Sequence, residues 1–161
     1  MADERLEVLV AEVHKEAPGI RSYELSRADG GEMPPFTAGA HVDVDVPGGL
    51  LRQYSLCNPP SERHRYVIAV KREEAGRGGS AAFVDRVKPG DKLRISRPRN
   101  HFPLSAGAKR HVLIAGGIGI TPMLAMAHEL RARGADFTLY YCTRSPELTA
   151  FHDLLSEPAF G

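Results

Sequence analysis

The sequence predicts a two-part fold, a six-stranded antiparallel barrel followed by the start of an open parallel α/β unit. Up to about Arg99, short alternating or β-branched segments are separated by turns rich in Gly and Pro, as in small all-β domains. Beyond Pro103, a continuous apolar run leads into a glycine-rich turn and a helix, which is typical of a buried parallel strand. We therefore expect one domain over residues 1–103 and another over 104–161.

The barrel half contains six candidate strands and one helix. Turn sequences such as Asp29-Gly-Gly, Pro47-Gly-Gly and Pro89-Gly-Asp separate the strands, because Gly and Pro favour tight turns. A short helix is expected at residues 80–87, with its apolar side chains facing the barrel. The strands are predicted at residues 7–14, 20–26, 41–46, 51–56, 66–71 and 92–96.

The second half reads as β-α-β-α. Strands are expected at residues 111–115 and 136–142. Thr121 is a suitable N-cap for the first helix, Pro122 a suitable first helical residue and Gly134 a natural C-terminal stop. Ser145-Pro-Glu is expected to open a second helix that ends before Pro158. A doubly wound domain has five or six parallel strands, so we expect a truncated nucleotide-binding domain with one apolar sheet face exposed.

Composition excludes several classes of function. The 161 residues carry a formal net charge of +1, which favours neither nucleic acid nor an anionic membrane as a partner. The sequence has no membrane-spanning apolar run and no signal-peptide pattern at its start, so we expect a cytoplasmic protein. Cys57 and Cys142 cannot supply the four thiolates of an iron–sulfur cluster. The histidines show no metal-ligand spacing or neighbouring carboxylate cluster, and we expect no metal.

The glycine turn after the first strand of the second half is a candidate phosphate site. Gly116, Gly117 and Gly119 would let a ligand approach the backbone closely, and the helix that follows directs its positive end toward a phosphate. The full dinucleotide fingerprint is absent, because Pro122 stands where the third glycine would fall and no acidic residue ends the second strand. The alternative is a glycine turn that serves only the chain reversal.

A second candidate anion site is Gly76-Arg77-Gly78-Gly79-Ser80, directly before the short helix. Glycines and a hydroxyl at a helix N-terminus describe an anion cradle. The alternative is a flexible hairpin end with solvated basic residues. Two phosphate cradles in one short chain would suit a redox enzyme that brings two phosphorylated cofactors together.

The tetrapeptide Arg52-Gln53-Tyr54-Ser55 lies on a predicted strand. Alternation places Arg52 and Tyr54 on one side and Gln53 and Ser55 on the other. Arg suits a phosphate and Tyr offers a flat face for a ring system. Taken alone, however, the tetrapeptide fits an ordinary strand better than a cofactor site.

The three motifs occur in the order found in the ferredoxin–NADP⁺ reductase superfamily, which the chain resembles. More narrowly, Arg-Gln-Tyr-Ser-Leu-Cys-Asn, Gly-Arg-Gly-Gly-Ser and Asn100-His-Phe-Pro-Leu104 resemble the FMN-containing phthalate dioxygenase reductase and vanillate demethylase reductase family. The similarity covers nearly the whole chain. It implies a flavin-binding barrel and an oxidoreductase that uses a nicotinamide nucleotide.

The resemblance also implies roles for individual residues. Arg52, with Gly78, Gly79 and Ser80, would bind the flavin phosphate. Tyr54 would pack on the isoalloxazine and Ser55 would hydrogen-bond near N5, so these two residues are the catalytic candidates. Gln53, between Arg52 and Tyr54, is a further cofactor-binding candidate. Both can touch flavin only if the strand edge or its twist exposes both. The remaining cofactor-binding candidates are the backbone of Ala69, Val70 and Lys71 for the flavin's pyrimidine edge, Gly116, Gly117, Gly119, Thr121 and Pro122 for the nicotinamide nucleotide, and Thr143 and Arg144 for its adenosine end.

The resemblance favours FMN over FAD and NADH over NADPH, although Arg144 stands where a 2′-phosphate would bind. It also implies electron transfer to a [2Fe-2S] domain or protein that serves an aromatic-ring oxygenase, and this chain lacks the cysteines for that domain. Two alternatives stay open. One is an FAD-containing enzyme of the ferredoxin–NADP⁺ reductase type, and the other is a truncated flavin-binding module without reductase activity. The sequence predicts no oligomeric state.

Overall fold

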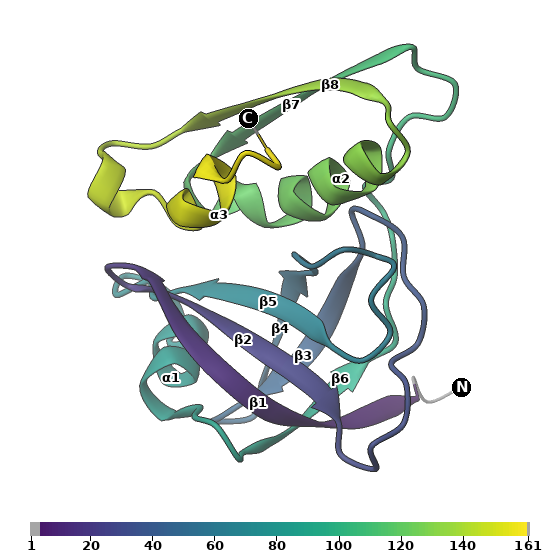
Figure 1. The fold of residues 1–161 in the computed structure, drawn as a ribbon. Coiled ribbons are helices and arrows are strands. Elements are labelled where there is room, and N and C mark those ends of the chain that lie inside the picture. The colour runs from purple at the N-terminus through teal and green to yellow at the C-terminus, as the bar shows by residue number, and fades with distance from the viewer. Residues whose placement is uncertain (1–3, 161) are drawn as a thin grey trace.

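The computed structural model describes residues 4–160 of the chain. Figure 1 shows a six-stranded barrel on one side and a two-stranded sheet on the other, with helices α2 (Ile120–Ala132) and α3 (His152–Ser156) lying between them. This arrangement confirms the predicted fold class, a barrel followed by an open parallel α/β unit.

The barrel strands are joined in the order β4-β3-β6-β1-β2-β5 through antiparallel pairs. The predicted bounds of β3, β5 and β6 match the structure, whereas β1 continues three residues beyond its predicted end. The reason is irregular pairing near Val10/Glu12 and Lys15/Ala17, since a bulge breaks the two-residue alternation by which a strand is recognised. The bounds are β1 Arg5–Ala17, β2 Ile20–Arg27, β3 His41–Val46, β4 Leu50–Ser55, β5 Tyr66–Lys71 and β6 Lys92–Ser96.

Helix α1 (Gly79–Arg86) closes one end of the barrel with its apolar face. Phe83 is fully buried, and its ring meets Tyr23 edge-on with the centroids 4.8 Å apart. The Arg21 guanidinium donates to the Val84 carbonyl at 3.0 Å, and Arg72 forms a two-pronged ion pair with Asp85. These contacts fix the position of α1, which carries one of the candidate anion sites.

The α/β unit contains the parallel strands β7 (Arg110–Gly116) and β8 (Asp136–Cys142). Gly134 ends α2 as predicted. Its φ of 65° lets the Gly134 N–H donate to the Arg131 carbonyl and the Ala135 N–H donate to the Leu130 carbonyl, which closes the C-terminus of the helix. The predicted N-cap of α2, Thr121, was wrong. A 3₁₀ turn at Gly117–Gly119 precedes the helix, and Gly119 is the N-cap.

Thr121 and Pro122 therefore lie inside the first turn of α2, where the Thr121 hydroxyl donates to the Ile118 carbonyl at 3.1 Å. The second predicted helix is also interrupted. It is a 3₁₀ turn at Pro146–Leu148 and the short helix α3, separated by Phe151 at a φ of 61°. Burying the Phe151 ring at the junction of the two halves compensates for this backbone strain.

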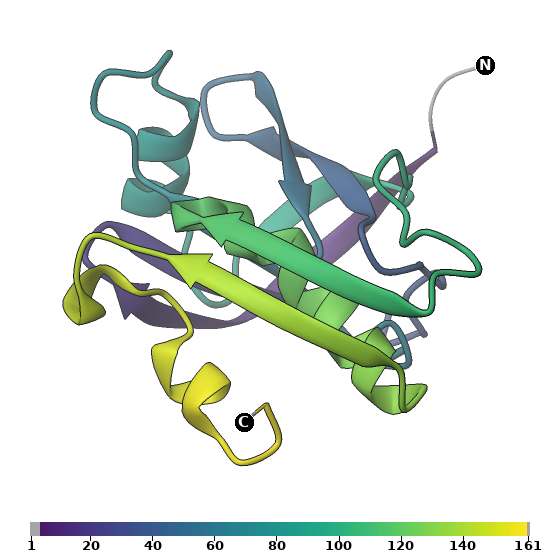
Figure 2. The same ribbon diagram turned by 90° about the horizontal axis from the view of Figure 1, so that it is seen from above.

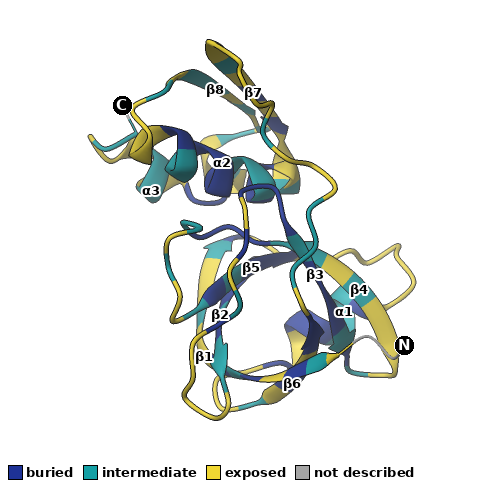
Figure 3. Ribbon diagram, turned by 90° about the vertical axis from the view of Figure 1, so that its right-hand side faces the viewer, coloured by how far each residue is buried: buried dark blue, intermediate teal, exposed yellow. Residues whose placement is uncertain are grey.

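One face of the β7–β8 sheet packs on α2 and the other is exposed (Figures 2 and 3). On the open face, Val112, Ile114 and Tyr140 are 57%, 65% and 57% exposed, as expected for a two-stranded sheet covered on one side. In the described part of the chain, no helix is long and apolar enough to cross a bilayer.

We predict that the buried Asp43 on β3 links folding stability to pH. Burial alone would raise its pKa, but the hydrogen-bonded Arg99 guanidinium outweighs burial and lowers the pKa below the usual 3.8. A lowered pKa stabilises the fold above about pH 4, and this stabilisation disappears as the pH falls through the folded-state value. Asp43→Asn should lower the free energy of unfolding at pH 7 by about 1–3 kcal/mol and flatten its acid dependence.

Urea unfolding between pH 3 and 7 checks this prediction. Asp45→Asn is the matched control, because Asp45 is on the same strand, is half exposed and lies 4.0 Å from Arg5. Equal pH profiles for the two variants would contradict the role given to Asp43.

Candidate functional site

The predicted flavin-site strands are the two edges of the barrel sheet. Residues Arg52 to Ser55 are on β4 and Ala69 to Lys71 are on β5, and these strands stand at opposite ends of the strand order. Beyond β4 the chain joins them, since the Cys57 N–H donates to the Val67 carbonyl at 2.8 Å. The outer edges of β4 and β5 thus present backbone groups with no neighbouring strand.

The register determines which backbone groups of β4 are free. The Leu56 N–H donates to the Ala40 carbonyl, so Tyr54 and its alternate neighbours form the hydrogen-bonded pairs with β3. Gln53 and Ser55 occupy the intervening positions and direct their N–H and C=O groups to the open edge. A ligand at this edge can therefore meet the Ser55 backbone and the Tyr54 ring together. The strand edge thus exposes both residues, although alternation places their side chains on opposite sides of β4.

Arg52 brings two of the predicted motifs together. A Cβ built on Gly79, the first residue of α1, would lie 2.7 Å from Arg52 Nε and 3.1 Å from Nη2. The guanidinium is held in place by a 2.8 Å bond from Nη1 to the Leu51 carbonyl. The positive side chain thus lies against the positive end of a helix, an arrangement that suits an anion bound by both.

The N-terminus of α1 is open to such an anion. Gly78 is the N-cap with a φ of 83°, no side chain caps the helix, and its first turn contains no acidic residue. The Ser80 hydroxyl accepts a 3.1 Å bond from the Glu73 N–H, so its own proton remains available to donate. The cradle would be filled by a side chain at position 79, and its donor set fits a phosphate.

Tyr54 offers a packed ring and a hydroxyl that stays protonated at physiological pH. Its ring packs on Phe83 with centroids 5.6 Å apart, and burial raises its pKa to about 12, which keeps it neutral at physiological pH. The buried hydroxyl has no hydrogen-bond partner within the described residues. A buried polar atom without a partner is costly, and a bound flavin would be able to supply one.

The three predicted residues of β5 differ in what they can offer. The Val70 side chain is in the barrel core and the Ala69 side chain is buried against the second half, so their backbone alone can face a ligand at the edge. The Lys71 side chain is exposed and forms a 2.9 Å ion pair with Glu73.

A cleft of about 620 Å³ between the two halves collects several predicted residues. Lys71 and Ile20 contribute from the barrel, and Gly117, Thr143 and Arg144 from the α/β unit. A slightly larger hollow, about 670 Å³, lies between β8 and α3 and contains none of the predicted residues. We assign the site to the smaller cleft because it combines the strand ends with a glycine turn, the usual place for a nucleotide in an open α/β sheet.

The glycine turn opens into free space. A Cβ on Gly116, Gly117 or Gly119 would have no neighbour within 4 Å, and the φ of 53° at Gly117 itself favours glycine. The turn therefore leaves room for a ligand beside the start of α2.

Thr143 and Arg144 both follow β8, but their side chains make different contacts. The Thr143 hydroxyl shares a 2.6 Å bond with the Thr149 hydroxyl and holds the turn at residues 143–149. Arg144 is exposed, lines the cleft and has no ion-pair partner among residues 4–160. Of the two, Arg144 is the side chain that is available to an anionic ligand.

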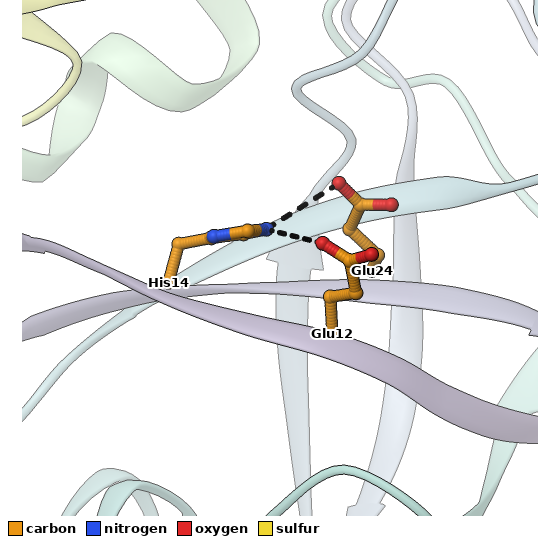
Figure 4. A group of neighbouring side chains, drawn as sticks. All are labelled: Glu12, His14 and Glu24. Carbon is orange, nitrogen blue, oxygen red and sulfur yellow. Dashed lines mark ion pairs between the residues drawn. The ribbon is translucent and has the colours of Figure 1, made fainter.

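The expectation that no histidine has a carboxylate cluster beside it was wrong. Figure 4 shows His14 between two carboxylates, with Nε2 at 3.1 Å from Glu12 and 3.6 Å from Glu24. The carboxylates come together because Glu12 and Glu24 are direct cross-strand partners on β1 and β2, a proximity that sequence spacing does not show. Arg65 lies 2.6 Å from the same Glu24 oxygen, so the cluster is an ion-pair network with a resident cation.

Comparison with known proteins supports a reductase relationship. No family model matches the chain. Vanillate O-demethylase oxidoreductase of Pseudomonas putida is 51% identical over 156 residues, which are 97% of this chain and 49% of that protein. The chain spans about half the length of the curated relatives it matches.

Solved structures of reductases and related domains are also similar to this chain. The structure of phthalate dioxygenase reductase, described as modular for electron transfer from pyridine nucleotides to [2Fe-2S], has a TM-score of 0.94 at 54% identity and is matched over 97% of this chain and 49% of its own. The flavohaem-like FAD/NAD-binding domain of a nitric oxide dioxygenase from Vibrio cholerae has a TM-score of 0.84 at 28% identity, over 94% and 70%. These matches confirm the resemblance predicted from the motifs.

Gly79→Ala tests the meeting of Arg52 with α1. The new methyl group must displace the guanidinium, which is the flexible end of a side chain, while Ala favours the helix by up to about 1 kcal/mol. We expect flavin affinity to fall at least about tenfold, a loss of about 1.4 kcal/mol, with no loss of thermal stability. Gly76→Ala is the control, since its Cβ would make only ordinary contacts at 3.4 Å or more. Equal flavin affinities, measured by fluorescence titration, would contradict this site.

Tyr54→Phe separates the ring from the hydroxyl. The flavin-free variant should unfold within about 1 kcal/mol of wild type, because the hydroxyl it loses has no partner in the described structure. Its stability should also fall less between pH 10 and 12, since a raised tyrosine pKa stabilises below 10 and that effect is lost as the pH rises toward 12. Calorimetry from pH 7 to pH 12 checks both expectations, and a large loss of stability at pH 7 would show that the hydroxyl has a protein partner.

Proposed function

Because the chain is homologous to phthalate dioxygenase reductase and vanillate O-demethylase oxidoreductase over nearly its whole length, we propose that it forms the flavin-binding part of an NAD(P)H-dependent oxidoreductase. Residues 1–103 would be the FMN-binding domain and residues 104–161 part of the nicotinamide-nucleotide domain. The observation that carries the proposal is the contact of Arg52 with the open N-terminus of α1 beside two unpaired strand edges.

FMN is the flavin that this cradle suits. A terminal phosphate carries up to two negative charges, and it would meet Arg52, the free N–H groups of α1 and the Ser80 hydroxyl in one compact place. The resemblance also favours FMN. The mass of the flavin released on denaturation distinguishes FMN from FAD.

The chain's residues would position the flavin ring and leave the chemistry to the cofactor, which accepts a hydride at N5 and releases electrons singly. The backbone groups of Gln53 and Ser55 on the open edge of β4, with the Ser55 hydroxyl, would hold the N5 side of the ring. The backbone of Ala69 and Lys71 would hold the pyrimidine edge from β5, and the Tyr54 ring would support one face.

The nicotinamide nucleotide would enter from the second half. Gly116, Gly117 and Gly119 would admit its phosphates at the start of α2, and Arg144 would meet its adenosine end across the 620 Å³ cleft. We propose NADH as the donor on the resemblance, although the unpaired Arg144 could also accept a 2′-phosphate. Comparing NADH with NADPH as reductants decides this point.

Electrons would pass from the flavin to a [2Fe-2S] domain or protein and then to an oxygenase. Support comes from the relatives, which include a reductase whose structure is described as transferring electrons from pyridine nucleotides to [2Fe-2S] and reductase components of oxygenases. Two alternatives are an FAD-containing reductase and a flavin-binding module without activity. The Vibrio cholerae neighbour, an FAD/NAD-binding domain, gives the first of these its support.

Anaerobic reduction tests the proposal directly. Purified chain loaded with FMN should be yellow and should bleach when NADH is added without oxygen. A yellow protein that bleaches with dithionite but with neither NADH nor NADPH is the module alternative. A colourless protein that fails to bind FMN and FAD would overturn the flavin site.

Paired arginine variants test the assignment of the two cofactors. Arg52→Ala should weaken FMN binding by at least about tenfold, because it removes the cationic side chain of the phosphate cradle. Arg144→Ala should leave FMN binding unchanged and raise the NADH concentration needed for half-maximal reduction. Fluorescence titration and stopped-flow absorbance measure the two effects, and equal losses of FMN affinity in both variants would contradict the assignment.

A further inference from the structure

The linker between the two halves is the segment from the end of β6 to the start of β7. It contains the motif Asn100-His-Phe-Pro-Leu, to which the proposed chemistry gives no role. Asn100 is fixed in this linker by its side-chain amide. Its Nδ2 donates to the Thr37 hydroxyl at 2.7 Å and to the Ala38 carbonyl at 2.9 Å, with a longer contact of 3.4 Å to the Thr37 carbonyl. Its Oδ1 accepts a 2.9 Å bond from the Phe102 N–H. One side chain thus ties the linker to the barrel loop before β3.

Gly39, in the same loop, permits an unusually close approach of two backbone segments. Its φ is 98°, and a Cβ built on it would lie 1.9 Å from the Phe102 carbonyl oxygen and 3.0 Å from the Met126 methyl group of α2. Any side chain at position 39 must therefore move the linker, and it would also meet α2. Asn100 and Gly39 act on the same short stretch of chain from two sides.

This stretch connects the two parts of the proposed site. On the barrel side, His41 and Arg99 exchange backbone hydrogen bonds of 2.9 and 3.0 Å, and His41 is the cross-strand partner of Ser55. On the other side, Met126 belongs to α2, the helix that begins at the glycine turn. The linker, which joins β6 to β7, therefore lies between β3, the strand that pairs with Ser55, and α2, the helix that would bind the nucleotide.

Buried apolar side chains among the described residues also join the two halves. Ala69 and Ile20 of the barrel pack with Ile120 and Leu124 of α2, and Ala38 packs against the same helix farther along. Apolar contact holds surfaces together but has little directional preference, whereas hydrogen bonds and a tight backbone approach fix direction and distance. The lateral position of α2 on the barrel thus depends on the linker.

We propose that Asn100 and Gly39 are positioning residues that set the orientation of the α/β unit on the barrel, and with it the approach of the nicotinamide to the flavin. The orientation rests on the fold alone, and the effect on hydride transfer rests on the proposed function. Hydride transfer needs reacting atoms at about 3–3.5 Å, and a shift of about 1 Å can slow it about 100-fold.

Residual dipolar couplings of the flavin-free chain test the orientation without any activity. One alignment tensor should fit both halves in wild type, and Gly39→Ala should need two different tensors. Gly107→Ala is the matched control, since Gly107 also has a positive φ, 77°, but no atom within 4 Å of its would-be Cβ. One common tensor in Gly39→Ala would overturn the proposal.

Asn100→Asp provides a second test of the positioning role. If Gly39→Ala does not fold, Asn100→Asp alone tests this role. The carboxylate keeps the acceptor for the Phe102 N–H but loses the donations to Thr37 and Ala38. We expect unchanged FMN affinity, a weaker charge-transfer absorbance between NADH and flavin, and flavin reduction slowed by about 10- to 100-fold. Thr37→Val, which removes one acceptor, should have a smaller effect.

The outcomes separate the two proposals. If wild type is not reduced by NADH or NADPH, the proposed function fails and the dipolar couplings still decide the positioning role. If wild type is reduced and Asn100→Asp matches it in rate and charge-transfer absorbance, the positioning role is wrong and the proposed function stands.

Discussion

The candidate site depends on one constraint, that β4 and β5 end the barrel sheet without pairing along their outer edges. Unpaired strand edges are normally a liability, and a ligand that bonds to them converts the exposed backbone into a binding surface. The β3–β4 register decides that Gln53 and Ser55, and not Tyr54, direct their backbone to this edge. The same register turns the Tyr54 ring toward Phe83.

Charge is organised around that edge. Arg52 reaches from β4 to the N-terminus of α1, and nearby acidic groups are already engaged, Asp85 with Arg72 and Glu73 with Lys71. These ion pairs offset the negative charge near Arg52 and the N-terminus of α1. The packing of α1 through Phe83 and Arg21 therefore contributes to ligand binding as well as to the core.

The strands and the order of the motifs were predictable from sequence because alternation and turn residues are local signals. The extension of β1 was not, since bulges hide alternation, and neither was the N-cap of α2, which moved from Thr121 to Gly119. The contact between Arg52 and Gly79 could be predicted only through resemblance, because it joins two distant segments. The carboxylates around His14, and the close contacts of Asn100 and Gly39, depend on cross-strand register and backbone approach that no local pattern encodes.

Titration of ¹⁵N-labelled chain with FMN, followed by amide NMR, tests the central claim most directly. The site predicts that the largest shifts fall on the amides of Gln53 and Ser55 at the β4 edge and of Gly79 and Ser80 at the start of α1. Amides of β1 and β6, away from the open edge, should remain nearly unchanged. Binding that shifts those distant strands, or leaves the four named amides unmoved, would contradict the account.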